Sequence, residues 1–299
     1  MKSMTTKIPL FAVLMAFIFA SCEDIIEVDL GEQNTEFYVV EAKITTEDNP
    51  YVYLYKSQSV SLDDPYRGIG GAKVVVADDA QPTNLVELTE HSSKTGFYTV
   101  PPEIEYMGKT GRKYTVIIEV DGVELTASDR IAEVEPIDFI EVKPSLRGDS
   151  IFLGIFTYGD EPVGLGDYYK WDIYINDTLL NDAQSLVIAS DELVDGNYIN
   201  GFEIFTDFHD PNTPEERKLQ LGDSIQVKQN SISAFTYNYF FQMLNQSQTG
   251  GLFSVPPANI ESNFTSSDGK PVLGLFTAQD VSVSNTVVID ENIESQLKD

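Results

Sequence analysis

The stretch "KYTVIIEVDGVELTASDRI", Lys113 to Ile131, decides the fold class. Two runs rich in β-branched residues flank the pair Asp121–Gly122. Both central residues of a type I′ hairpin turn need positive φ angles, which Asp and Gly tolerate. We therefore predict two antiparallel strands joined by a two-residue turn. The same strand character extends toward the N-terminus, in the runs 37–44, 51–60, 72–78 and 96–100.

These short strands and turns predict a β-sandwich over residues 36–134. In the run 51–60, Tyr51, Tyr53 and Tyr55 share one face. That face is interpreted as one that packs within the fold, because a sheet needs one buried face, although the tyrosines suit a binding surface equally well.

A second β-rich domain is predicted over residues 135–290. The boundary is expected within Glu133–Pro144, because Pro136 and Pro144 break regular strand pairing. The fold class predicted is thus mainly β, with two tandem β-sandwich domains of the Ig-like or transthyretin-like kind and a frayed tail over 291–299. One strand of the second domain shows clear alternation of buried and polar positions, with Tyr169, Trp171, Ile173 and Ile175 on one face.

Residues 231–247 have a helical period instead. Ile232, Phe235, Tyr239 and Met243 recur at spacings of three and four, and Ser231 or Ser233 suits the N-cap. We predict one amphipathic helix packed on the second domain. Its aromatic stripe is interpreted as the core-facing side rather than as a ligand platform.

Residues 1–21 have the pattern of an export signal. Lys2 and Lys7 give a positive start, and the run Ile8–Ala20 is apolar and uncharged. This run is shorter than the roughly 20 residues that span a bilayer, but it suits a signal-peptide core.

Cys22, the one cysteine of the chain, follows this run. The stretch resembles a bacterial lipobox, which implies cleavage before Cys22 and acylation of its thiol. Two or more acyl chains anchor a protein stably in a membrane. Glu23 and Asp24 resemble the acidic export signal of Bacteroidetes lipoproteins, which implies the outer membrane and its exterior face. Residues 22–35 are then an acidic tether.

Composition excludes several classes of protein. The formal net charge of −29 repels phosphate backbones, so nucleic-acid binding is not expected. Hydrophobic residues make up 42% of the chain, which argues against an acidic disordered protein. With Cys22 acylated, no thiol chemistry or disulfide remains.

The search for chemistry gives no catalytic group and no cofactor. The two histidines, His91 and His209, lie in predicted turns, and no HExxH or GxSxG motif occurs. The loop "DFHDPNTPEE" offers Asp207 and Asp210 as weak metal-ligand candidates. "DELVDGNYING", from Asp191, is similarly acidic. Such clusters also arise simply from an acid-rich composition.

Three short motifs, at Asp149, Asp177 and Asp223, resemble the Asp–Ser/Thr–apolar acceptor sites for O-glycosylation in exported Bacteroidetes proteins. The resemblance implies that Ser150, Thr178 and Ser224 carry the sugar, while the start of a strand is the alternative explanation for each.

Four stretches together resemble the uncharacterised Bacteroidetes lipoproteins grouped as domain of unknown function 4249. They are "FYVVEAKITTEDNPYVYLYKSQSV", "GDSIQVKQNSISAFTYNYFFQMLNQ", "VPPANIESNF" and "VLGLFTAQDVS". The resemblance implies no catalytic residue. It implies an accessory lipoprotein of a TonB-dependent outer-membrane transporter, which is the function expected here.

The expected partners are therefore outer-membrane lipid through Cys22, a transporter barrel and an extracellular ligand of unknown identity. A surface adhesin or carbohydrate-binding module is the alternative. A hydrolase that uses a pair of acids is the third hypothesis, because paired carboxylates can cleave glycosides.

Overall fold

The computed structural model describes residues 36–57, 67–81, 83–148, 150–206, 208, 219–247 and 260–296. The chain divides into two units, and the second, Glu36–Asp299, contains every described residue. This unit is mainly β, as predicted.

A nine-stranded sheet forms the first part of the unit. Its strand order is β15-β7-β6-β3-β4-β5-β2-β1-β16. The strands are β1 (Tyr38–Thr45), β2 (Tyr51–Lys56), β3 (Lys73–Asp78), β4 (Leu85–Glu90), β5 (Phe97–Thr99), β6 (Lys113–Val120), β7 (Val123–Arg130), β15 (Thr265–Ser266) and β16 (Val272–Gln279).

The predicted hairpin at Asp121–Gly122 is confirmed. Its turn residues have φ angles of 52° and 78°, and β6 pairs with β7 in antiparallel register up to Val120 and Val123. Strand β4 was not predicted. Only Leu88 of its six residues is buried, so the sequence there lacks a regular apolar alternation.

The nine-stranded sheet folds over its own core. Strands β7 and β16 lie apart in the strand order, yet the backbone N–H of Ala278 donates to Asp129 Oδ2 over 3.1 Å. Leu125 and Phe276 belong to the same buried cluster.

Strand β2 contributes Val52 and Leu54 to that core, whereas Tyr51, Tyr53 and Tyr55 lie half-buried on its other face. There, Tyr51 stacks on Phe97 at 5.7 Å between ring centroids, so packing contacts do form on the tyrosine face.

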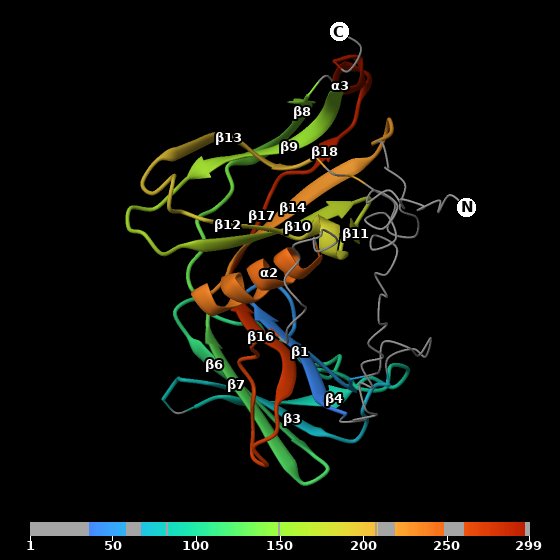
Figure 1. Ribbon diagram of the computed structural model, residues 1–299, viewed down its shortest axis with the longest axis vertical. Helices are drawn as coiled ribbons and strands as arrows, with labels where there is room; N and C mark the ends of the chain where they lie inside the picture. The colour runs from blue at the N-terminus through green and yellow to red at the C-terminus, as the bar shows by residue number, and fades with distance from the viewer. Residues whose placement is uncertain are drawn as a thin grey trace, which may run out of the picture. The chain divides into compact units, whose positions relative to one another are not determined.

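Strands β1 and β16 lie side by side and run parallel, although they come from opposite ends of the described chain (blue and red in Figure 1). Val40 pairs with Gly274 and Ala42 with Phe276. Strand β15, also from the C-terminal part, pairs with β7 in the antiparallel direction. The region predicted as the C-terminal domain therefore contributes two strands to the sheet built from residues 36–134, and sheet pairing crosses the predicted boundary.

Two smaller sheets form the rest of the unit. One has the order β13-β9-β8, and the other has the path β11-β10-β14-β17 with β12 and β18 beside it. Their bounds are β8 (Phe139–Arg147), β9 (Ser150–Asp160), β10 (Tyr168–Ile175), β11 (Thr178–Leu179), β12 (Val187–Ser190), β13 (Tyr198–Phe205), β14 (Ser224–Ser231), β17 (Val281–Val283) and β18 (Val287–Val288).

Side chains of both sheets share one buried cluster, so they pack as two layers of a sandwich. Ile140 and Ile155 come from the first sheet, and Ile173 and Val227 from the second. The alternation predicted in β10 is confirmed, since Tyr169, Trp171, Ile173 and Ile175 are all buried.

The expectation that Pro144 ends regular pairing was wrong. Pro144 lies inside β8 and pairs with Leu153. Because β8 is the outer strand of its sheet, a missing N–H on its open side breaks no ladder bond.

The predicted helix is confirmed as α2 (Ala234–Ser247). Ser233 caps it, because its Oγ accepts a bond from the Thr236 N–H over 3.3 Å. Of the predicted stripe, Ile232 is buried and Tyr239 and Met243 are half-buried, but Phe235 is 39% exposed and Thr236 of the helix is fully buried. The predicted tail contains a short helix, α3 (Glu291–Ser295), and a single 3-10 turn, η1 (Ala183–Ser185), precedes β12. Within the described residues, every helix is too short or too polar to cross a bilayer.

Candidate functional site

A pocket of about 320 Å³ opens between the two layers of the sandwich. Its walls come from the end of β9, from β10, β12, β13 and β14, from the loop after β12, and from Tyr237 of α2. The volume lies at the lower end of the range found for small-molecule sites.

Five aromatic rings line this aromatic pocket. Trp171 is buried, and its ring centroid lies 5.9 Å from that of Tyr169 and 6.4 Å from that of Phe202. Phe202 is 47% exposed, so the rings extend from the interior to the surface. Tyr158 and Tyr237 complete the set. A wall of aromatic rings that extends from the buried interior to the surface suits a flat or apolar ligand.

Hydrogen bonds fix the polar groups of the wall. The Trp171 Nε1–H donates to Gln229 Oε1 over 2.9 Å, and Gln229 Nε2 donates to the Glu135 carbonyl over 3.0 Å. The Tyr169 hydroxyl donates to Glu161 Oε1 over 2.9 Å. These bonds hold the Trp171, Tyr169 and Gln229 side chains in one orientation, as a preformed site requires.

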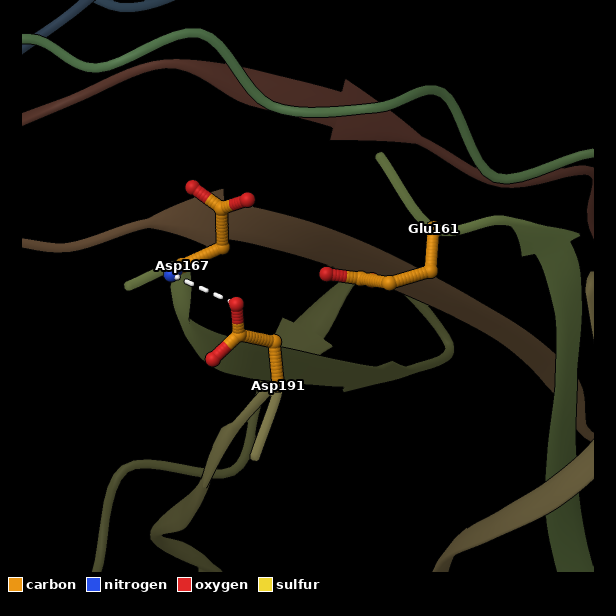
Figure 2. A group of neighbouring side chains, drawn as sticks. All are labelled: Glu161, Asp167 and Asp191. Atoms are coloured by element: carbon orange, nitrogen blue, oxygen red, sulfur yellow. Dashed lines mark hydrogen bonds between the residues drawn. The ribbon is translucent and has the colours of Figure 1, made fainter. Parts of the chain in front are cut away.

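Beside the pocket, Glu161, Asp167 and Asp191 form an acidic cluster with carboxylate oxygens within 4.8 Å of one another (Figure 2). Glu161 follows β9, Asp167 precedes β10 and Asp191 follows β12. The connection between β9 and β10 thus meets the end of β12 at this edge of the sandwich.

Asp191 has a structural role in this cluster. Its Oδ2 accepts bonds from the backbone N–H groups of Gly166 and Asp167, over 2.8 and 3.1 Å, and its side chain is almost wholly buried. Asp195 Oδ1 accepts from Gly164 N–H in the same way. The two loops that flank the aromatic pocket are therefore held together by charge-assisted bonds to the backbone.

Burial raises the pKa of Glu161, and the neighbouring charges of Asp167 and Asp191 add to this effect. Burial likewise raises the pKa of Asp167, again with a contribution from Asp191. The pKa of Tyr169 is also raised, first by burial and then by its bond to Glu161. The raised pKa values of Glu161 and Asp167 therefore reflect partial desolvation first, and then repulsion by neighbouring carboxylates.

This arrangement gives stability a pH dependence. A carboxyl group whose folded pKa is raised is easier to ionise in the unfolded chain, so its contribution to folding stability falls as pH rises above the ordinary carboxyl pKa. We expect the Glu161→Gln variant to gain stability over the natural chain between about pH 4.5 and pH 7.5, the range above the ordinary pKa of Glu. Urea unfolding followed by Trp171 fluorescence measures this difference.

Glu141→Gln is the matched control, with the opposite sign. The Tyr158 hydroxyl bond, and then the one from Lys143, lower the pKa of Glu141. Its ionised form therefore stabilises the fold at neutral pH, and this contribution is lost as pH falls through the lowered pKa. Equal pH slopes for the two variants would contradict the assignment.

As a metal site the acidic cluster is incomplete. Calcium takes six to eight oxygen ligands. Three carboxylates do not reach that number even if each binds through both oxygens, since Asp191 already uses one of its oxygens to accept two backbone bonds.

Among the site residues predicted from sequence, Ser150, Thr178 and Ser224 lie outside the aromatic pocket and the acidic cluster. Cys22, Asp207 and Asp210 fall outside the described residues. Ser150 and Thr178 are exposed, Ser150 at the start of β9 and Thr178 just after a two-residue turn. Ser224 is half-buried, and its hydroxyl donates to Asn176 Oδ1 over 3.3 Å.

Sequence reasoning missed the aromatic pocket. Trp171 and Tyr169 were assigned to a buried strand face, which is correct, but nothing in the sequence shows that Phe202 and Tyr237 approach them. Asp191 lay in a stretch recognised as acidic, whereas Glu161 and Asp167 were not singled out. An available signal was the position of Asp167 directly before the predicted strand that contains Tyr169 and Trp171, whereas β12, which Asp191 follows, was not predicted.

The fold and pocket thus define a mainly β protein with an aromatic pocket between its sheets. Comparison of its sequence with known families classifies the protein more narrowly. A family model described as "Domain of unknown function (DUF4249)" matches residues 23–285, and the chain belongs to this family. No curated protein matches the chain.

Proposed function

We propose that this protein captures a small ligand without turning it over, as a lipid-anchored accessory to a TonB-dependent uptake system in the outer membrane. The aromatic pocket carries the proposal, because it joins apolar ring faces to a few fixed polar groups. The lipobox-like stretch before Cys22 supports anchoring, and the acidic residues after it favour the exterior face.

Ligand capture is tested through Trp171, which is the single tryptophan of the chain, so its fluorescence reports on the pocket alone. The purified full chain in detergent is titrated with a panel of nutrient-sized amines, sugars and short peptides. We expect at least one class to shift the Trp171 emission saturably, and Phe202→Leu to weaken that binding by about tenfold through loss of ring contact.

Phe235→Leu is the control, because Phe235 is also partly exposed and does not line the pocket. Equal effects of the two variants, or no response to any compound, would overturn the capture function. Turnover of a bound compound that Glu161→Gln abolishes would favour the hydrolase alternative. Binding only of extended glycans would favour the adhesin or carbohydrate-binding alternative. Co-purification of a TonB-dependent barrel, identified by mass spectrometry, tests the link to uptake.

A further inference from the structure

The charged side chains that line the aromatic pocket are all acidic. They are Asp160, Glu161 and Glu192, and the lining residues include no Lys, Arg or His. Glu161 is half-buried between the rings and the acidic cluster, whereas Asp160 and Glu192 are exposed at the mouth. A ligand that enters therefore passes acidic groups at the surface and meets another deeper in.

Most N–H donors of the described wall side chains are used within the protein, and one N–H of the Gln229 amide is the exception. Trp171 donates to Gln229, and Gln229 donates to the Glu135 carbonyl. The Tyr169 hydroxyl is committed to Glu161. The groups that remain for a ligand are mainly acceptors: carboxylate oxygens, and the hydroxyls of Thr157, Ser190 and Tyr237, which can both accept and donate.

The rings favour the same kind of ligand. The face of an aromatic ring is negative, so a cation over it is attracted, and Trp is the strongest partner. The pocket presents Trp171 together with Tyr169 and Phe202 next to the Glu161 carboxylate. Ring faces and carboxylate together select positive charge, and an anion would meet repulsion from both.

We propose that the aromatic pocket binds a small organic cation: an ammonium group that donates to Glu161, attached to a flat apolar body that stacks on Trp171 and Phe202. The inference rests on the proposed capture function and specifies its ligand. The volume of about 320 Å³ accommodates one ring with a short amine chain.

The test uses probes of one shape and different charge. Phenethylammonium, neutral 2-phenylethanol and anionic 3-phenylpropionate are titrated separately into the full chain, with glucose as a neutral sugar, and Trp171 emission is recorded. We expect phenethylammonium to bind at least about tenfold more tightly than 2-phenylethanol, because a hydrogen bond to a charged group discriminates by about that factor. The anion and glucose are expected to give no saturable shift.

Glu161→Gln is expected to reduce this preference for the cation to about twofold or less. Glutamine keeps an oxygen that accepts the Tyr169 bond, so the wall stays in place. Glu87→Gln is the matched control, since Glu87 is exposed on β4 and lies outside the pocket, and its loss changes the net charge equally. It should leave the preference intact at about 0.15 M salt, where distant charges are screened.

Two outcomes overturn the inference and leave the capture function standing. One is equal or tighter binding of 2-phenylethanol, 3-phenylpropionate or glucose. The other is an unchanged preference in Glu161→Gln. Failure of the capture function is a different result, in which no compound of any charge shifts Trp171 emission saturably.

Discussion

Replacing Gly274 with alanine is expected to destabilise the protein by about 3 kcal/mol or more, because the substitution adds both a clash and backbone strain. Gly274 has a φ of 95°, and a Cβ placed there lies 2.0 Å from the Val40 carbonyl oxygen. That oxygen belongs to the backbone of β1, directly opposite in the parallel pair, so neither strand has room to move without breaking the pairing. Urea unfolding monitored by circular dichroism measures the loss.

Gly269→Ala separates the two effects. Gly269 precedes the same strand and also has a positive φ, of 73°, but no atom lies within 4 Å of a Cβ built on it. Only the left-handed backbone is penalised there, at about 1 to 2 kcal/mol. If the two alanine variants lost equal stability, the close approach of β1 and β16 at Gly274 would be wrong.

The second prediction with a large expected effect concerns the attachment of the protein to the membrane. Under the proposed lipid anchoring, replacing Cys22 with serine is expected to abolish acylation and to release nearly all of the protein from the membrane fraction. Each buried methylene of an acyl chain contributes about 0.8 kcal/mol, so the loss of two or more chains removes the whole anchor. Mass spectrometry of the N-terminal peptide and fractionation of lysed cells measure the two consequences.

Ser21→Ala is the control, since it keeps a small residue before Cys22 and preserves the lipobox-like pattern. It should retain full acylation. A native chain that begins at Met1 with a bare Cys22 thiol would refute both the anchor and the proposed location.

Local signals in the sequence predicted the local elements well. The Asp121–Gly122 hairpin depends on two adjacent residues that tolerate positive φ, and the helix over 234–247 on a repeated apolar spacing. The β1–β16 pair has no such signal, because its partners come from opposite ends of the chain. Only the tertiary fold determines that pairing.

The aromatic pocket could not be predicted from the sequence, for a related reason. The buried face of β10 was predicted, but a row of buried rings has the same pattern whether it packs against a core or faces a cavity. The decisive neighbours, Phe202 and Tyr237, come from a different sheet and from a helix. Glu161, Asp167 and Asp191 likewise meet only because the ends of β9 and β12 and the start of β10 lie at one edge.

The β1–β16 pair has a consequence for the order in which the protein can mature. A nascent chain that has reached Ser247 contains β1 through β7 but neither β15 nor β16, so β1 still has bare N–H and C=O groups along one side. Such an open edge pairs readily with other chains. Strands β1 to β7 must therefore wait for β16 to emerge, and synthesis that stops before Val272 is expected to release a product prone to aggregate.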